Sequence, residues 1–231
     1  MVGCALAWVL GRRFRRIIVL KKESAPGLHA SGRNSGVVHS GFNPKPGTLK
    51  ARLCIEGNRR LAEYAQANGV PFRRVGTFVI ARSESEAKVI EILRRNGVAN
   101  GVPGIEIISG DALRKHEPNA LGDAALYAPT GAIIDSISFV QSLAESAKKQ
   151  GAEFLFGCQV NGIREMADHV EISTDTKRIS AAFVVNCAGV YADKIAHAMG
   201  IGRKNDPLTV EPISKSFIDE GTASAYRLRH E

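Results

Sequence analysis

Residues 1–23, MVGCALAWVLGRRFRRIIVLKKE, decide the fold class. Residues 3–10 are apolar enough for a buried helix, and Gly11 follows them as a turn residue. Ile17–Leu20 is an unbroken aliphatic run, which is typical of a parallel strand covered on both faces. A helix followed by such a strand is half of a β–α–β unit. We therefore expect an α/β fold on a parallel sheet, with the first strand of that unit absent from this chain.

Residues 138–199 return to the same alternation. Ser138–Gln150 has helical periodicity, and Glu153–Phe156 and Val170–Ser173 are expected to be strands. Ala182–Cys187 is an apolar run that we expect to be a strand, followed by a turn at Ala188-Gly189 and a helix over Tyr191–Met199. A strand, a glycine turn and a helix in series place a ligand at the carboxyl end of a parallel sheet.

The middle of the chain has a different pattern. A helix is expected over residues 47–68 with Gly69 just beyond its end, and a strand over Thr77–Ala81. Ser83 and Glu86 form a capping box that starts a helix running to about Arg95. Short strands and helices continue to residue 135, as in an inserted mixed α+β lobe. The expected organisation is a sheet lobe of residues 1–69 and 136–202, an inserted lobe of residues 70–135, and an irregular tail of residues 203–231.

Composition restricts the class of partner. The chain has 231 residues, a formal net charge of +8 and 44% hydrophobic residues, which suits a globular protein with a substantial core. It contains no zinc-finger spacing and no aromatic-basic RNA motif, so a basic surface that attracts small anions is preferred to nucleic-acid binding.

Cysteine and histidine spacing argues against a disulfide framework and a metal site. The four cysteines form no C-x-x-C pair, and the six histidines do not cluster at ligand spacing, so we expect free thiols and no metal. The apolar start MVGCALAWVL is too short to span a bilayer, and its basic residues follow the apolar run, which is the wrong order for a secretory signal. A mitochondrial presequence is disfavoured because serine is missing there, so we expect a soluble, cytoplasmic protein.

A glycine-rich stretch, SGRNSGVVHSG, occupies residues 31–41. Its glycines permit positive φ and close approach of the backbone, which allows an amide-lined anion site, but an ordinary surface turn has the same composition. Gly3 is in the place of the third glycine of a G-x-G-x-x-G dinucleotide motif. Lys21 occupies the position where an acidic residue would hold the ribose hydroxyls, and a lysine ammonium cannot accept hydrogen bonds from them. Glu23 is an imperfect substitute.

Several longer motifs together resemble one family. The sequence is similar to the FAD-dependent L-2-hydroxyglutarate dehydrogenase/oxidase group, within the glycine oxidase and D-amino-acid oxidase class of flavoproteins, over about residues 3–200. The motifs that carry the resemblance are SGRNSGVVHSG, KPGTLKARLCIEGNRRL, GVPFRRVGTFVIA, ANGVPGIEII, EPNALGDAALYAPTGAIID and FVVNCAGVYAD. The resemblance implies a Rossmann-like FAD-binding sheet lobe and an inserted substrate lobe. It implies oxidation of L-2-hydroxyglutarate to 2-oxoglutarate, with hydride passing to flavin N5 while a base removes the hydroxyl proton.

The resemblance also implies roles for individual residues. His39 matches a histidine facing the flavin, and imidazole ordinarily titrates near neutral pH, which suits a general base. A core histidine satisfied by backbone groups is the alternative. Lys45 and Lys50 are candidates for binding substrate carboxylates, although lysines at a helix start are commonly just solvated. The positions expected to contact FAD are Gly3, Gly32, Arg33, Asn34, Ser35, Gly36, Val160, Ala188 and Gly189.

The chain departs from the family at several places. The family's first strand and first two cofactor glycines have no counterpart before Met1, Asn43-Pro44 replaces paired tyrosines, and residues beyond about 205 do not resemble the family's continuation. We therefore expect a chain truncated at both ends, and a non-catalytic fragment competes with the enzyme as an interpretation. A flavin oxidase acting on an amino acid or glycerol 3-phosphate is a third interpretation. The electron acceptor is not indicated by any motif.

Overall fold

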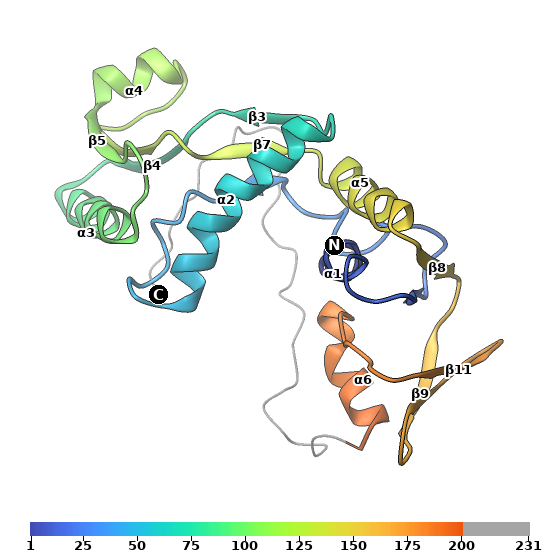
Figure 1. The fold of residues 1–231 in the computed structure, drawn as a ribbon. Helices are drawn as coiled ribbons and strands as arrows, with labels where there is room; N and C mark the ends of the chain where they lie inside the picture. Colours follow the sequence, from blue (N-terminus) through green and yellow to red (C-terminus); the bar gives the residue numbers. More distant parts are fainter. Residues whose placement is uncertain (201–231) are drawn as a thin grey trace. The chain divides into compact units, whose positions relative to one another are not determined.

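A computed structural model describes residues 1–200 of the chain (Figure 1). These residues form two compact units. Unit 1 contains Met1–Arg33 and, within the described residues, 140–200, whereas unit 2 contains Asn34–Phe139. Helices and sheets are mixed in both units, so the expected α/β class is confirmed. The expected tail of residues 203–231 lies outside the described residues.

The boundary between the compact units differs from the expected lobe boundary. Residues 34–69 belong with the middle of the chain in unit 2, whereas we expected them in the sheet lobe. The reason is that the helix of residues 49–67 packs on the strand that follows it and on the next helix, both of which belong to unit 2. The assignment of cofactor and substrate roles to the two lobes stays a prediction.

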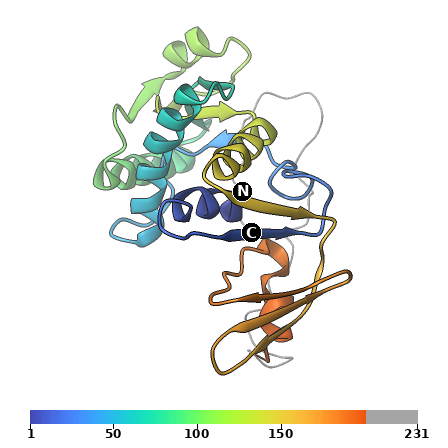
Figure 2. The same ribbon diagram turned by 45° about the vertical axis from the view of Figure 1, so that its right-hand side comes forward.

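The core of unit 1 is a parallel strand pair covered by two helices (Figure 2). The pair runs in register from Ile17 opposite Ala152 to Lys21 opposite Phe156. Ala7 and Ala147, one from each helix, are buried against it. Small alanines at these positions let the helix backbones approach the strands closely. The elements are α1 (Val2–Leu10), β1 (Ile17–Lys21), α5 (Ser136–Lys149), which begins in unit 2, and β8 (Ala152–Phe156).

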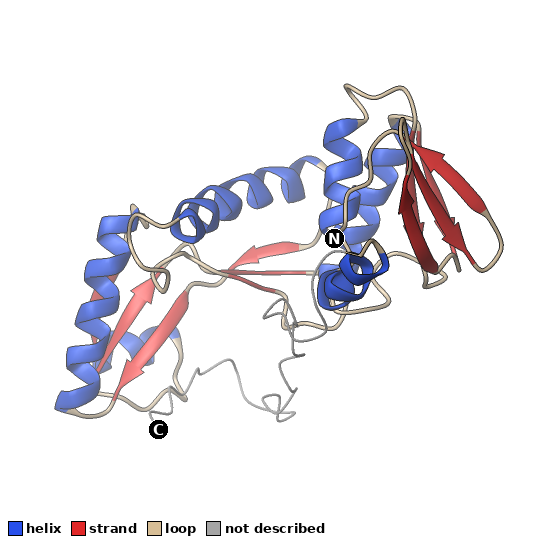
Figure 3. Cartoon of the chain, turned by 90° about the horizontal axis from the view of Figure 1, so that it is seen from below, coloured by secondary structure: helices blue, strands red, loops and turns tan. Residues whose placement is uncertain are grey.

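A second sheet in unit 1 is antiparallel and has the order β11-β10-β9 (Figure 3). Ile163 and Ile172 are buried as directly opposed residues on neighbouring strands. The only part of this sheet expected from the sequence was Val170–Ser173. Its strands are β9 (Val160–Glu165), β10 (Val170–Thr174) and β11 (Arg178–Ala181).

The expected strand Ala182–Cys187 is wrong. Residues 183–188 form neither helix nor strand, and they lead into the 3-10 turn η1 (Gly189–Tyr191) and helix α6 (Ala192–Ala198). No strand within residues 1–200 pairs with this segment, and Phe183 is 78% exposed. An apolar run becomes a strand only when a neighbour accepts and donates its ladder hydrogen bonds.

In unit 2, the helix expected over residues 47–68 is present as α2 (Leu49–Ala67). The Thr48 side chain caps its first turn by accepting a hydrogen bond from the Ala51 amide at 3.3 Å. Gly69 follows its end with a φ of +64°. The local signals at both ends therefore place this helix correctly.

The main sheet of unit 2 has the order β4-β6-β5 and is antiparallel. Val79 and Ala81 of β4 pack on one face with α3, whereas Phe78 and Ile80 pack on the other face with Leu113 of α4. This alternation follows from the two-residue period of a strand. The elements are β4 (Thr77–Ala81), α3 (Glu84–Asn100), β5 (Glu106–Ser109), α4 (Gly110–His116) and β6 (Ala124–Ala128).

Helix α3 continues past Arg95, where we expected it to end, as far as Asn100. Position 97, inside the helix, requires glycine. A Cβ there would be 2.3 Å from Ile105 Cδ1 and 3.1 Å from Phe42 Cβ. A glycine that normally weakens a helix here makes room for two apolar side chains. The helix ends instead at Gly101, which has a φ of +80°.

A small antiparallel sheet of order β2-β7-β3 completes unit 2. It comprises β2 (Val37–Val38), β7 (Ala132–Ile134) and β3 (Phe72–Arg74). These strands are too short to be expected from periodicity. No helix among residues 1–200 is long and apolar enough to span a membrane.

Candidate active site

The loop that follows β1 and the turn that precedes α6 lie together in unit 1. The His29 Nε2 atom is 3.4 Å from the Tyr191 hydroxyl, and their ring centroids are 5.3 Å apart. The Lys22 ammonium lies 3.9 Å from the centroid of the Tyr191 ring, which is a cation–π contact. The loop after β1 and the turn before α6 therefore meet at the carboxyl end of β1.

The turn before α6 is held by Asn186. Its side-chain oxygen accepts from the Ala188 amide at 3.1 Å, and its side-chain nitrogen donates to the Ala192 carbonyl at 2.8 Å. Gly189 has a φ of +59°, and a Cβ built there would meet no described atom within 4 Å. The backbone at Gly189 is thus exposed and open to the approach of a phosphate.

The start of α1 contacts the segment leading into this turn. A Cβ built on Gly3 would lie 3.4 Å from Cys187 Cβ, which is an ordinary van der Waals distance. Packing within the described residues therefore does not require glycine at position 3, and its expected contact with cofactor stays a prediction.

The amides of the glycine-rich loop are largely used within it. The Gly32 amide donates to the His29 carbonyl at 2.9 Å, and the Arg33 amide donates to the Ala30 carbonyl at 3.3 Å. The Gly36 amide donates to the Asn34 side-chain oxygen at 2.9 Å. These amides need no phosphate to satisfy them. The role of the 32–36 loop, Ser35 included, in binding FAD therefore stays a prediction.

Asn34 and Gly36 also have structural partners in unit 2. The Asn34 side-chain oxygen accepts from the Ser136 hydroxyl at 2.7 Å, at the start of α5. Gly36 has a φ of +66°, and a Cβ there would lie 2.5 Å from the Ile134 carbonyl oxygen of β7. The close approach of β7 therefore requires glycine at position 36, independently of any ligand.

His39 directly follows β2 and is exposed. Its carbonyl accepts a hydrogen bond from the Asn58 side-chain nitrogen at 3.1 Å, while its imidazole is left to solvent. The neighbouring Ser40 hydroxyl is 2% exposed and has no hydrogen-bond partner among the described residues. A buried hydroxyl without a partner costs about 1–3 kcal/mol.

Lys45 and Lys50 lie on the two sides of Thr48, the residue that caps α2, and both are exposed. An open groove of about 520 Å³ runs along this helix start. It is lined by Gly47, Thr48, Leu49, Ala51, Arg52, Ala99 and Asn100. A helix start flanked by ammonium groups has the charge to attract a carboxylate.

The remaining expected positions are at the ends of strands in unit 1. Val160 begins β9, is half-buried and lies opposite Thr174. Lys21 is the last residue of β1, and its carbonyl accepts from the Cys158 amide at 2.9 Å. Glu23 pairs with Lys22 at 3.7 Å, so the nearest carboxylate already has a cationic partner. The open Gly189 backbone fits a nucleotide phosphate, whereas Lys21 offers no acceptor to a ribose.

The thiols and acidic groups of residues 1–200 form no cluster of three or more metal-ligating side chains. The four cysteines are free; Cys4 and Cys158 are buried, Cys54 is half-buried and Cys187 is exposed. Burial raises the pKa of the Cys4 thiol, an effect that the nearby amino terminus and the Lys21 ammonium oppose. A thiol with a raised pKa is mostly protonated at neutral pH and is a poor nucleophile.

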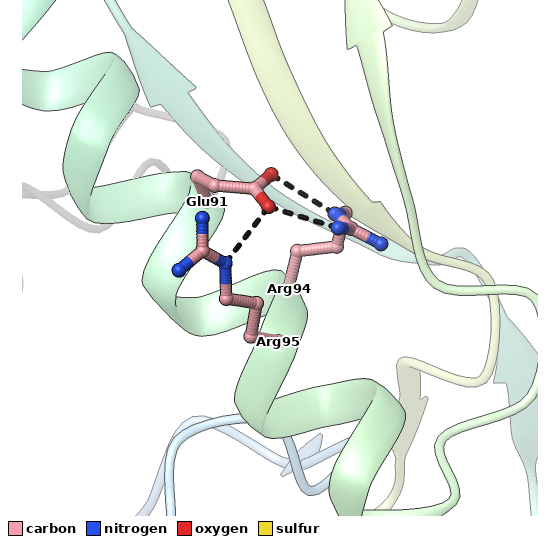
Figure 4. A network of polar contacts seen from close by, with 3 residues as sticks. All are labelled: Glu91, Arg94 and Arg95. Atoms are coloured by element: carbon pink, nitrogen blue, oxygen red, sulfur yellow. Dashed lines mark hydrogen bonds and ion pairs between the residues drawn. The ribbon is translucent and has the colours of Figure 1, made fainter.

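A charged network on α3 is shown in Figure 4. Glu91 accepts two hydrogen bonds from Arg94, at 2.8 and 2.9 Å, and one from Arg95 at 3.1 Å. The hydrogen bonds from Arg94, and then those from Arg95, lower the pKa of Glu91 to about 2. These contacts join residues three and four apart on one helix and support its surface.

Comparison with known proteins identifies the family to which the chain belongs. The profile of the FAD dependent oxidoreductase (DAO) family matches residues 1–222. The chain is 36% identical to glycerol 3-phosphate dehydrogenase of Caloramator mitchellensis over 197 residues, which is 84% of this chain and 41% of that protein. It is 34% identical to the mitochondrial L-2-hydroxyglutarate dehydrogenase of Homo sapiens over 212 residues, which is 86% of this chain and 46% of that protein.

A solved structure with the same fold is the L-alpha-glycerophosphate oxidase of Mycoplasma pneumoniae with FAD bound. Its TM-score is 0.81 at 25% identity, covering 86% of this chain and 54% of that one. The chain spans less than half the length of the two curated relatives above.

Sequence reasoning missed three residues that hold the candidate segments within their own units. Asn58 and Asn186 hold the backbone at His39 and at Ala188, and Tyr191 joins the turn before α6 to the loop after β1. A polar residue on the buried face of an amphipathic helix was the available signal for Asn58. Asn186 and Tyr191 carried no comparable local signal, because their partners are set by turn geometry and by a distant segment.

Proposed function

Since the chain belongs to the FAD dependent oxidoreductase family, we propose that it takes part in FAD-dependent oxidation of a 2-hydroxy acid, specifically L-2-hydroxyglutarate to 2-oxoglutarate. One observation supports this substrate class above others. His39 and Lys45 lie exposed on the single connection between β2 and α2, and Lys50 lies exposed in the first turn of α2. A base and two ammonium groups match a substrate with one hydroxyl and two carboxylates.

The chain's own residues divide the work as follows. Bound FAD would supply the hydride acceptor for the carbon that carries the hydroxyl. His39 takes the hydroxyl proton on its imidazole, so that the alkoxide develops only as the hydride leaves. Lys45 and Lys50 neutralise the two carboxylates and hold the substrate in one orientation.

FAD is the cofactor of this family, and the residues proposed to hold it divide between loop and turn. We assign the Ala188 and Gly189 backbone and the loop of residues 32–36 to the phosphates, Gly3 to the helix start beside them, and Val160 to the adenine. A cytoplasmic location stays a prediction, because relatives named as mitochondrial match as well as bacterial ones.

Oxidation of glycerol 3-phosphate is the second candidate. Two similar proteins favour it: the relative named glycerol 3-phosphate dehydrogenase, at 36% identity, and the solved structure of the FAD-bound glycerophosphate oxidase. A phosphate dianion would also pair with two lysines. Amino-acid oxidation and a fragment without catalytic activity are distinguished from both by the following experiment.

The test starts with purified protein incubated with FAD and desalted. Flavin absorbance near one FAD per chain supports the enzyme, and protein that retains no flavin is the non-catalytic fragment. Anaerobic flavin reduction with L-2-hydroxyglutarate, glycerol 3-phosphate or glycine then identifies the substrate.

The base is tested by His39→Ala, with His169→Ala as the matched control. We expect His39→Ala to slow flavin reduction by about 10²–10⁴-fold, as for loss of a general base, and the control to have no effect. His169 is in unit 1, where it pairs with Asp168 at 2.6 Å. Full turnover in His39→Ala would remove His39 from the role of base.

A further inference from the structure

The connection between β2 and α2 carries His39 and Lys45, but it has no regular secondary structure of its own. Its backbone carbonyls are instead bound by two asparagine side chains from neighbouring helices. Asn58 belongs to α2 and Asn100 is the last residue of α3.

Asn58 uses both of its amide protons. Its side-chain nitrogen donates to the His39 carbonyl at 3.1 Å and to the Thr130 carbonyl at 2.9 Å. Its oxygen faces Arg74, whose guanidinium lies 3.5 Å away and also donates to the Thr130 carbonyl at 3.1 Å. Two carbonyls can be met only by the nitrogen end of the amide, so the chemistry of the partners determines its orientation.

Burial makes this contact costly to lose. Asn58 is 7% exposed, and it is one of two polar residues among the buried ones of residues 1–200, the other being Ser40. A buried amide is retained when all of its hydrogen bonds are made, and removing it leaves carbonyls unpaired. Asn58 thus joins the residue after β2 to the turn before β7.

Asn100 makes a second bridge further along the same connection. Its side-chain nitrogen donates to the Gly41 carbonyl at 2.9 Å and to the Pro44 carbonyl at 2.8 Å. Between the two carbonyls that Asn100 binds, Phe42 is 4% exposed and packs in the core beside Gly97 of α3. The connection is therefore held at His39, at Phe42 and just before Lys45.

We propose that Asn58 and Asn100 are positioning residues for the reaction, with Asn58 orienting the backbone of His39 and Asn100 that of Lys45. This inference rests on the proposed roles of His39 and Lys45. A catalytic base must be held within a few tenths of an ångström, and an irregular connection cannot supply that precision without such bridges. Loss of each bridge therefore affects a different kinetic parameter.

The test compares Asn58→Leu and Asn100→Leu with the control Asn68→Ala in FAD-loaded protein. Leucine removes both donors at similar volume. The Asn68 side chain also donates to a carbonyl, that of Tyr64 at 2.9 Å, but on the exposed end of α2 away from the connection. We expect Asn58→Leu to lower kcat by about 10–100-fold with KM within about 3-fold, as for displacement of a catalytic group.

Asn100→Leu is expected to raise KM by about 10-fold with kcat little changed, because Lys45 binds substrate without taking part in proton transfer. Asn68→Ala should alter neither parameter. An Asn58→Leu protein with normal kcat, or an Asn100→Leu protein with normal KM, would overturn the corresponding assignment. If Asn58→Leu fails to fold, Asn58→Ser, which is too short to reach either carbonyl, replaces it with the same expected result.

Hydrogen exchange separates this inference from the proposed function. Amide exchange across residues 39–45 should speed up in Asn58→Leu and Asn100→Leu but not in Asn68→Ala. Unchanged exchange refutes the bridges whether or not the enzyme turns over. A wild-type protein that reduces no flavin with any 2-hydroxy acid refutes the proposed function, while faster exchange in the two variants would still support the bridges.

Discussion

Replacing Gly36 by alanine tests why the glycine-rich stretch contains this glycine. Two hypotheses about the role of Gly36 make opposite predictions. If Gly36 serves only to approach a phosphate, Gly36→Ala weakens FAD binding and leaves folding intact. If Gly36 is required by the close approach of β7, Gly36→Ala destabilises unit 2 in the absence of any ligand.

The structure allows the size of the second effect to be worked out. The left-handed φ of +66° costs a non-glycine residue about 1–2 kcal/mol, offset by about 0.4–1 kcal/mol from the stiffer unfolded chain. The new Cβ would be 2.5 Å from the Ile134 carbonyl oxygen, whereas such contacts normally need about 3.3 Å. Moving the strands apart breaks the bond from the Ile134 amide to the Gly36 carbonyl, now 2.9 Å, at about 1–3 kcal/mol. We expect a total loss of about 1–5 kcal/mol in the free energy of unfolding.

Gly47→Ala is the matched control. Gly47 has a φ of +79°, but no described atom lies within 4 Å of a Cβ built there, so only the backbone cost of about 1 kcal/mol applies. The assay is urea denaturation of the flavin-free proteins followed by circular dichroism. Equal losses of unfolding free energy in Gly36→Ala and Gly47→Ala would refute the steric argument. A loss of FAD affinity in Gly36→Ala without a loss of stability would favour the hypothesis that Gly36 approaches a phosphate.

Three further outcomes are expected. Lys21→Glu should raise FAD affinity by about tenfold in a fluorescence titration, because a carboxylate accepts hydrogen bonds from the ribose, and weaker binding would contradict this. Glu91→Gln should lower stability at neutral pH, because Arg94 and Arg95 depress the pKa of Glu91 from 4.5 to about 2. The stabilisation that ionised Glu91 provides is complete above about pH 4.5 and is lost as the pH falls toward 2. The denaturation midpoints of the variant and the wild type should therefore converge across that range. A constant difference between the midpoints would count against the network. Leu113→Ala should cost about 3–5 kcal/mol of unfolding free energy, because Leu113 is fully buried, and a loss below about 1 kcal/mol would mean that the site refills.

The sequence by itself determined those elements whose signals are local. Helix α3 begins where the sequence predicts, because the Ser83 side chain accepts a hydrogen bond from an amide of its first turn. Helix α2 was expected from residue 47 and begins at Leu49, after the Thr48 cap. The aliphatic run at Ile17–Lys21 forms a strand as expected. The family motifs also indicated His39 and the glycine-rich stretch as candidates, and their roles stay predictions.

Only the tertiary structure decided which segments acquire partners. Ala182–Cys187 has the composition of a strand and is not one, whereas Val37–Val38 is too short to be expected and pairs with β7. The same dependence on distant partners explains Asn58, whose value lies in the carbonyls of His39 and Thr130 at separations of 19 and 72 residues. Capping and periodicity act within a few residues, but ladder pairing and buried amide bridges depend on segments far away in the chain, so no local pattern can specify them.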